Sequence, residues 1–556
     1  MANPSPDGTP SASSRLAPLT LLAVTLAVSV VSLWNGFAGD DVYIIAQNSR
    51  VHDLAPAWQY LRQSYWPSEF GGGLYRPLTV LGFALQWKLG GGIAAAFHAV
   101  NVLLYAATTM AVWLLARRLL TAGAAWLVAA FFAVHPVHVE AVANVVGQPE
   151  ILVTGLHLTA VIWYLSARRR GALTYGVILG IAAIYLVSCL AKENAVVLPG
   201  LLLLAELVLV PSREPPAPRL KALLPFFGIL VVVGLGYIAA RGAVVGGLVG
   251  EYPHPAIRNA SIGGRALTML EVVPQWWRLL LVPWHLQSDY MPLELNRGTG
   301  FGGPQAMGAL FVLAWGWAAW RARRTYPVAT FGLAWVAVTL FPVSNLLVPT
   351  GILLAERTLF SPSAGACLAI GGVAPWIAAR VSAAPLWERQ VAGGFAAALL
   401  LLWGSRSAAR ATVWRADPIL ARQTVVDAPL SYRAHATMGK ILFAEGNPEA
   451  GEREYRIALK LYPHDPNVFA GLGQHYRNAG LYRPAIPLFR KALELAPQMN
   501  GVRNMLIYCL AQSGDSAGAA AQLAEKLARH EADADRIAVM LDSLYRSRGT
   551  GPSTAR

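Results

Sequence analysis

The run ALLPFFGILVVVGLGYIAA occupies residues 222–240 and contains no charged side chain. An α-helix of about 20 residues crosses the ~30 Å hydrocarbon core of a bilayer, so this run predicts a membrane-spanning helix. Similar apolar runs recur from about residue 16 to residue 404. Of the 556 residues 55% are hydrophobic and 13% are charged, whereas soluble proteins carry roughly 25% charged residues. The composition therefore excludes a disordered chain, a coiled coil and a soluble enzyme of ordinary make-up.

We expect about eleven spans in this apolar half. They lie near residues 16–36, 93–116, 119–134, 150–167, 172–190, 195–211, 222–240, 304–320, 327–343, 364–380 and 390–404. The first has no clear small-x-small cleavage site, so we expect a retained helix rather than a signal peptide. Two weaker segments are expected at the outer interface: Leu78–Leu89 is short and carries Lys88, and Arg265–Pro283 carries Trp276 and Trp277, which suit the level of the lipid headgroups.

Clusters of arginine and lysine predict the orientation, because such clusters favour the cytoplasmic side. With about eleven spans and an inside N-terminus, five clusters fall on the inner side. They are Arg117-Arg118, Arg168-Arg169-Arg170, Arg213/Arg219/Lys221, Arg321/Arg323/Arg324 and Arg380/Arg389. The outer side then holds the polar C-terminal half and the loops 37–92, 135–149, 191–194, 241–303 and 344–363.

The net charge of +15 comes from 45 Lys and Arg against 30 Asp and Glu. Such an excess often indicates a nucleic-acid partner, but in a membrane protein part of it is the topology signal of cytoplasmic Lys and Arg. Because the charge density is low and apolar runs are many, we expect no nucleic-acid binding. The three cysteines show neither a disulfide framework nor a zinc pattern.

From about residue 405 the chain turns polar, and a repeat with a period of 34 follows. Residues 466–498 read PNVFAGLGQHYRNAGLYRPAIPLFRKALELAPQ, with the apolar, small and aromatic residues of the tetratricopeptide pattern. The repeat from Tyr432 matches well, and the one from Asn500 keeps only the apolar stripe. We expect a membrane domain at 1–404, a linker and partial repeat helix at 405–431, tetratricopeptide repeats at 432–533, and a C-terminal helix and tail at 534–556.

The concave face of such a stack normally binds a peptide or a partner protein. A purely structural role for the repeats is the alternative.

Two adjacent acids, Asp40 and Asp41, follow the first predicted span. Polar groups at the rim of apolar segments are costly and are therefore functional candidates. Such acids can act as a general base, or bind a divalent cation that holds a phosphate or diphosphate. Solvated acids that end a helix are the alternative.

The sequence HPVHVE ends the third predicted span with His135, His138 and Glu140. This spacing can serve a metal or a phosphate, but no Cys or further His completes a zinc set, so the metal stays unknown. Histidines that cap a helix at the interface are the alternative. Gln148 and Glu150 begin the next span and can line the same cavity.

Lys192 and Glu193 lie between two apolar runs, and Glu356 and Arg357 precede another. Lys192 can bind a phosphate as a point charge, or pair with an acid at a turn. Arg357 can grip a phosphate with two N–H groups while Glu356 fixes it.

Arg76 and Asp289 are further charged residues of the outer loops. Taken with the acids, cations and histidines above, they suit a pocket for a phosphate-bearing, lipid-linked substrate.

These motifs, in this order, resemble the transmembrane and tetratricopeptide-repeat O-mannosyltransferases of the endoplasmic reticulum. The matching stretches are the early Asp40-Asp41, YRPLTVLGFAL from Tyr75, FHAVNVLLY from Phe97, FFAVHPVHVEAVANVVGQPE from Phe131, Lys192-Glu193, FPVSN from Phe341 and AERTLFSPS from Ala355. The resemblance covers nearly the whole chain. The family is similar to the wider class of polytopic C-type glycosyltransferases, which use polyprenyl-phosphate sugars.

The resemblance implies an all-α fold, with a polytopic helix bundle of the C-type glycosyltransferase kind followed by a short tetratricopeptide solenoid. It also implies an enzyme that moves a sugar from a polyprenyl phosphate to Ser or Thr of a protein acceptor on the non-cytoplasmic face. Asp40 or Asp41 would deprotonate the hydroxyl, while Arg357, Lys192 or the histidines neutralise the leaving phosphate.

The repeat array is shorter than in the animal members, and the Ala- and Arg-rich usage resembles that of bacteria. We therefore expect a bacterial inner-membrane homologue whose site and repeats face the periplasm.

Two other functions remain as alternatives. A polymerase or ligase for surface polysaccharide also uses polyprenyl-linked sugars, and a non-catalytic scaffold would recruit partners through the repeats. A transporter fits less well because its site would lie near the midplane of the membrane, whereas the polar residues here gather at one face.

Overall fold

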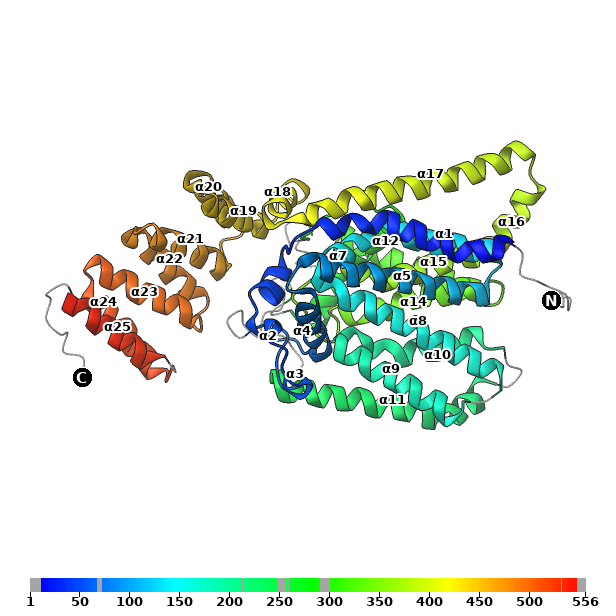
Figure 1. Cartoon of the computed structure of the whole chain (residues 1–556), viewed down its shortest axis with the longest axis horizontal. Helices are drawn as coiled ribbons and strands as arrows, with labels where there is room; N and C mark the ends of the chain where they lie inside the picture. The colour runs from blue at the N-terminus through cyan, green and yellow to red at the C-terminus, as the bar shows by residue number, and fades with distance from the viewer. Residues whose placement is uncertain are drawn as a thin grey trace. The chain divides into compact units, whose positions relative to one another are not determined.

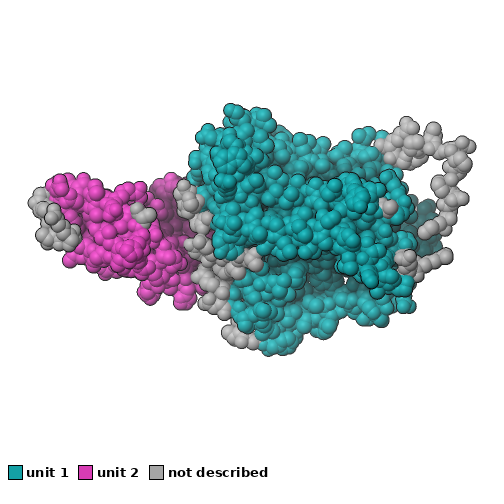
Figure 2. Space-filling model, turned by 90° about the horizontal axis from the view of Figure 1, so that it is seen from below, with its two compact units in different colours: residues 1–420 teal, residues 421–556 magenta. Residues whose placement is uncertain are grey.

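The computed structural model describes residues 12–67, 73–171, 173–211, 215–247, 257, 260–290, 301–531 and 533–547. The chain forms two compact units, residues 1–420 and residues 421–556, coloured teal and magenta in Figure 2. Every regular element among the described residues is helical. The predicted all-α fold, with a bundle of apolar helices followed by repeats, is confirmed.

Every predicted span falls on a helix of the first unit (Figure 1). These helices are α1 (Ala12–Ser29) with η1 (Val30–Trp34), α5 (Ala94–Leu119), α6 (Ala122–Val134), α8 (Gln148–Arg169), α9 (Tyr175–Ala191), α10 (Leu198–Leu209), α11 (Pro216–Val245), α13 (Gly303–Ala322), α14 (Pro327–Leu340), α15 (Phe360–Gly372) with α16 (Ala374–Ala383), and α17 (Leu386–Ala411).

Six helices of the described residues are long and apolar enough to cross a membrane, or seven if the bent pair Ala122–Val134 and Pro136–Ala143 is one span. This number is lower than the eleven or so that we expected, because several predicted spans form short helices. For example, α10 has 12 residues and α14 has 14. The chain is an integral membrane protein, and the larger number of spans stays a prediction.

Short helices gather at one end of the long ones, where α1 ends and α5 begins (Figure 1). They are α2 (Ser49–His52), α3 (Ala57–Tyr60) and α4 (Pro77–Gly90). Neither α4 nor α12 (Ile262–Leu281), which cover the two segments expected at the interface, is among the helices able to span. This end of the bundle carries the charged residues described below.

Close helix packing in the membrane unit depends on small residues. A Cβ atom added to Gly332 of α14 would lie 2.4 Å from the carbonyl oxygen of Gly365 in α15. Real Cβ atoms do not approach so closely, so only glycine permits this contact. Small residues play this part in membrane helix pairs generally, because they let two backbones come together.

The described residues of the second unit, after the end of α18 (Asp417–Asp427), form three helix pairs and a final helix. The pairs are α19 (Tyr432–Ala444) with α20 (Pro448–Leu461), α21 (Pro466–Asn478) with α22 (Tyr482–Leu495), and α23 (Asn500–Ser513) with α24 (Ser516–Ala528); α25 (Ala534–Ser547) follows. Their first helices begin at the three positions that the sequence predicts. The third repeat, whose signal is weak in the sequence, forms a helix pair like the others.

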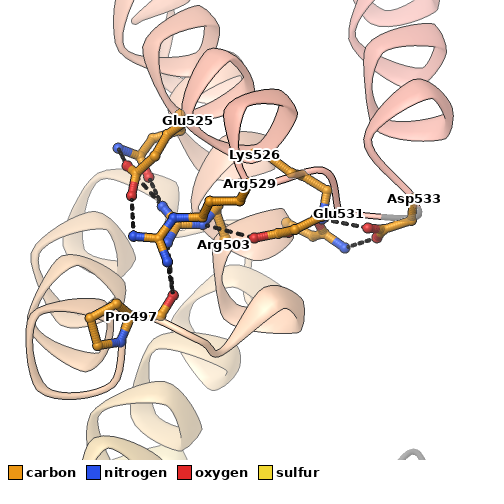
Figure 3. A network of polar contacts seen from close by, with 9 residues as sticks. Pro497, Arg503, Glu525, Lys526, Arg529, Glu531 and Asp533 are labelled. Atoms are coloured by element: carbon orange, nitrogen blue, oxygen red, sulfur yellow. Dashed lines mark hydrogen bonds and ion pairs between the residues drawn. The ribbon is translucent and has the colours of Figure 1, made fainter.

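The last repeat buries a network of charges that we did not predict (Figure 3). Lys526 and Arg503 have 0% and 2% of their side chains exposed. Lys526 pairs with Glu531 at 2.6 Å and with Asp533 at 2.5 Å, and Arg503 pairs with Glu525 at 2.9 Å. Because Glu531 and Asp533 lie just before α25, the network fastens the final helix to the third repeat.

Candidate active site

Asp41 is a buried anchor rather than an open acid. Its side chain is 1% exposed, and its Oδ2 and Oδ1 accept hydrogen bonds from the backbone N–H groups of Val145 at 3.0 Å and Val146 at 2.8 Å. Burial raises the pKa of Asp41 to about 8, and the two N–H donors oppose that rise. Asp41 thus fastens the loop after α1 to η5 (Val145–Gly147).

Asp40, its neighbour, is partly exposed. Within the described ranges its carboxylate has no hydrogen-bond or ion-pair partner. Burial raises the pKa of Asp40. The positive charges of Arg357 and Arg76 oppose this rise, while the acids Glu140 and Asp417 add to it. Of the two adjacent acids, Asp40 is therefore the one whose oxygen atoms can meet a substrate.

Glu140 holds Arg357 in place. The Oε2 atom of Glu140 accepts from the backbone N–H of Arg357 at 2.8 Å, and Oε1 accepts from the guanidinium group. Glu140 lies in α7 (Val139–Ala143), and Arg357 lies in η8 (Glu356–Leu359). The side chain of Glu140 is 3% exposed and that of Arg357 is 25% exposed. The guanidinium is therefore fixed on one side and open on the other.

Glu356 does not fix Arg357, contrary to our expectation. Its Oε1 accepts from the backbone N–H of Gln287 at 2.5 Å and from the Tyr290 hydroxyl at 2.9 Å. Consecutive residues of a 3₁₀ turn point in different directions, so Glu356 and Arg357 reach different partners. Asp289 lies half-buried in the loop that Glu356 holds.

Two further ion pairs involve Lys192 and Glu193, which are neighbours in the sequence. Arg76 donates from Nε to Glu193 at 2.8 Å and from a second nitrogen at 2.5 Å. Burial opposes ionisation of Glu193, but the Arg76 charge prevails and lowers the pKa of Glu193 to about 2. Lys192 pairs instead with Glu150 at the start of α8, and both side chains are 7% exposed. Lys192 and Glu193 therefore form ion pairs with Glu150 and Arg76 rather than with each other.

The two histidines point into the protein interior. His135 bonds through Nε2 to the carbonyl oxygen of Leu280 at 3.0 Å and accepts at Nδ1 from the N–H of Val137 at 3.3 Å. His138 lies between the Tyr105 hydroxyl at 2.8 Å and the Ser363 hydroxyl at 2.7 Å. All four ring nitrogens thus have protein partners, and the ring of His135 caps the turn that follows it.

Two acids of this end of the bundle are poorly marked in the sequence. The sequence predicts Glu150 only as a lining residue, and its place at the start of an apolar run is a usable signal. Asp417 accepts a hydrogen bond from the Gly39 N–H at 2.6 Å. Its partner lies 378 positions away in the chain, so no local pattern could mark Asp417.

No group of three or more His, Cys, Asp or Glu side chains among the described residues is arranged to hold a metal ion. A divalent cation stays an expectation from the sequence alone. The site contains one open carboxylate, that of Asp40, and the guanidinium groups of Arg357 and Arg76, each of which an acid holds in place. Such a set can accept a proton and can bind a phosphate oxygen.

Comparison with known proteins gives matches in both halves of the chain. The family model described as "Tetratricopeptide repeat" matches residues 436–500 and 470–536. Protein O-mannosyl-transferase F38B6.6 of Caenorhabditis elegans is 23% identical over 82% of this chain and 65% of its own length. Protein O-mannosyl-transferase TMTC4 of Mus musculus is 26% identical over 79% and 66%, and TMTC1 of Homo sapiens is 26% identical over 82% and 57%.

Among solved structures, a match is the crystal structure of ArnT from Cupriavidus metallidurans bound to undecaprenyl phosphate. It has 15% identity and a TM-score of 0.36 and covers 92% of this chain and 80% of that one. The chain spans less than two thirds of the length of the first curated relatives it matches. The sequence matches confirm the predicted resemblance: the chain is similar to protein O-mannosyl-transferases over most of its length and carries tetratricopeptide repeats.

Proposed function

We propose that the protein is a membrane glycosyltransferase that moves a sugar from a polyprenyl phosphate to a Ser or Thr hydroxyl of a protein acceptor. The observation that carries the proposal is the open Asp40 carboxylate, which lies within electrostatic reach of Arg357 and Arg76. The names of the relatives support transfer to protein and make mannose the first sugar to test.

Asp40 is the general base of the proposed reaction. Its oxygen takes the proton of the acceptor hydroxyl as that hydroxyl oxygen attacks the anomeric carbon of the sugar. The bond between the anomeric carbon and the phosphate oxygen breaks, and its electron pair leaves on the polyprenyl phosphate. A single displacement of this kind inverts the anomeric carbon. A raised pKa makes Asp40 a stronger base than an ordinary aspartate.

Arg357 is the best placed of the cations to neutralise the leaving phosphate. Its side chain is 25% exposed, against 7% for Lys192. Arg76 already uses two of its nitrogens on Glu193, whereas Arg357 spends one nitrogen on Glu140. Hydrogen-bond donors held in place toward a developing negative charge contribute much of the stabilisation of a transition state. Glu140 supplies that preorganisation.

A lipid-linked donor suits the position of the site. The charged residues follow the ends of apolar helices, so a polyprenyl tail can remain in the bilayer while its phosphate lies at the rim. By the preference of Lys and Arg for the cytoplasmic side, this end of the bundle faces away from the cytoplasm. In a bacterial inner membrane it faces the periplasm, and the tetratricopeptide repeats then bind the protein acceptor on the same side.

Glycoproteomics of a deletion strain tests the proposal. We expect a set of Ser- or Thr-linked glycopeptides to disappear on deletion and to return with the wild-type gene. Asp40→Asn should not restore them, whereas Asp53→Asn, which changes an exposed acid of the same loop region, should. Glycopeptides that persist in the Asp40→Asn strain would contradict the proposal.

The same strains separate the alternatives. A changed surface polysaccharide with an unchanged set of glycopeptides would favour the polymerase or ligase. A phenotype that survives Asp40→Asn but is lost when the repeats are disrupted would favour the scaffold. A phosphatase reporter fused after Arg556 tests the orientation, and cytoplasmic location of that end would contradict it.

A further inference from the structure

The end of α17 and the residues that follow it form part of the candidate site. The side-chain amide of Asn35 donates to the carbonyl oxygen of Ala411 at 2.9 Å, and the N–H of Gly36 donates to the carbonyl oxygen of Arg415 at 2.9 Å. The N–H of Gly39 donates to the Asp417 carboxylate at 2.6 Å. Three hydrogen bonds thus fasten residues 411–417 to the loop that carries Asp40.

Apolar contacts strengthen this attachment. Ala411 and Trp414 belong to one buried cluster with Val139 and Ala143, which flank Glu140 in α7. The same residues 411–417 therefore contact both the loop of the open acid and the helix that holds Arg357. Within residues 405–431, where the sequence predicts a linker and a partial repeat helix, η9 (Thr412–Arg415) packs within the first unit.

Gly39 adopts a backbone conformation that residues with a Cβ atom rarely adopt. Its φ angle is +61°, and an added Cβ atom would lie 3.5 Å from Leu420 and 3.8 Å from Trp414. Glycine adopts this left-handed conformation without strain. In this conformation its N–H meets the Asp417 carboxylate, and the next residue is Asp40.

From these contacts we propose that Asp417 is a positioning residue for Asp40, acting through the N–H of Gly39. The proposal rests on the proposed function, in which Asp40 is the base. Asp417 lies at the first position of α18 (Asp417–Asp427), and the repeats begin at Tyr432 soon after. The segment that leads into the repeats is therefore the segment that orients the proposed base.

The charge of Asp417 also acts on Asp40. The groups that face Asp40 are Arg357 from η8, Arg76 from the start of α4, Glu140 from α7, Asp417 from α18, the adjacent Asp41, and Tyr65. The two arginines lower the pKa of Asp40, and Glu140 and Asp417 raise it. Removal of the Asp417 charge therefore shifts the pKa of Asp40 downward, toward that of an ordinary aspartate.

Two variants separate the hydrogen bond from the charge. In Asp417→Asn an amide oxygen can still accept from Gly39, while the charge is gone; in Asp417→Ala both are gone. The assay uses the purified full-length protein in lipid nanodiscs, polyprenyl-phosphate mannose with a radioactive sugar, and a peptide from a protein that loses its glycan in the deletion strain. The readouts are kcat and kcat/KM across pH.

We expect both variants to move the rising limb of the kcat/KM profile to lower pH, because each removes a negative charge that raises the pKa of Asp40. At high pH the kcat of Asp417→Asn should stay within about twofold of wild type, because the acceptor for Gly39 remains, whereas Asp417→Ala should lose about tenfold in kcat with little change in donor KM. Asp427→Asn, at the other end of α18, should leave the profile unchanged.

An Asp417→Ala enzyme with full kcat would overturn the positioning role, and an Asp417→Asn profile that coincides with wild type would overturn the effect of the Asp417 charge on Asp40. If Asp417→Ala does not fold, as judged by gel filtration, Asp417→Leu, which also lacks an acceptor for Gly39, takes its place. Asp40→Asn separates the two proposals. If Asp40→Asn is active, Asp40 is not the base and both proposals fail. If Asp40→Asn is inactive and the Asp417 variants behave like wild type, only the positioning role fails.

Discussion

The last repeat and the charged end of the membrane bundle both bury ionised side chains, yet they differ in one respect. In the repeat, Lys526 and Arg503 are almost fully buried, and acids pair with each (Figure 3). In the bundle, Lys192 and Arg357 likewise have the acids Glu150 and Glu140. The charged end of the bundle also holds Asp40, a partly buried acid whose carboxylate has no partner among the described residues.

The difference separates charges that hold a fold together from charges that can act on a substrate. A buried ion pair is weak support for stability and no sign of function by itself. An acid with a raised pKa, beside fixed cations and partly open to solvent, is a better candidate for chemistry. The four predictions that follow test this comparison.

The largest expected effect is on transfer, from Asp40→Asn. Loss of a general base typically costs about 100-fold to 10,000-fold in rate, and the variant should keep the thermal stability of wild type because no described partner is lost. Sugar transfer in nanodiscs and a thermal melt check both points.

Asp41→Asn should instead lower stability, since an amide nitrogen would face one of the two N–H donors. If Asp41→Asn is stable and inactive while Asp40→Asn is active, the roles are reversed.

The next largest effect is on stability, and it is expected in both regions. Lys192→Ala removes the cation that pairs with Glu150. Lys526→Ala removes the nearest cation from Glu531 and Asp533, which keep only longer contacts to Arg503 and Arg536. Breaking a buried pair by removing one partner costs roughly 3–5 kcal/mol. Denaturation of the purified full-length protein measures both losses. A variant as stable as wild type would show that its pair is dispensable to the fold.

A smaller effect concerns the pH dependence of sugar transfer, to which only the charged end of the bundle should contribute. The base Asp40 must be ionised to act, and burial raises its pKa above the ordinary 3.8. Transfer should therefore fall as pH drops through that raised value, within a range where an ordinary aspartate would remain ionised. The network of the last repeat has no part in this limb, so Lys526→Met should leave its position unchanged. A kcat/KM profile that is flat down to pH 4 would argue against Asp40 as the base.

The smallest effect comes from an exposed pair on the repeats. Lys491 and Glu494 are 42% and 66% exposed and lie 2.6 Å apart. Exposed pairs of this kind contribute about 0.5 kcal/mol or less, because water screens both charges. Lys491→Ala should therefore change neither denaturation nor transfer measurably. A large loss of transfer would instead place this surface in acceptor binding.

Several features were determined by the sequence alone, because they depend on local patterns. Apolar runs place the membrane helices, since burial of each run requires only its own composition and length. The period of 34 places the first helix of each repeat at Tyr432, Pro466 and Asn500, as observed. Charged residues at the rims of apolar runs identify most of the residues that later meet around Asp40.

Only the tertiary structure decided which charge meets which. Lys192 and Glu193 are neighbours in the chain but pair with Glu150 and Arg76 from other helices. The two adjacent acids separate into the anchor Asp41 and the open Asp40 because two N–H groups of η5 reach only one of them. Asp417 meets Gly39 across 378 positions of sequence. Such pairings depend on how the helix ends pack together, and a local sequence pattern does not specify that packing.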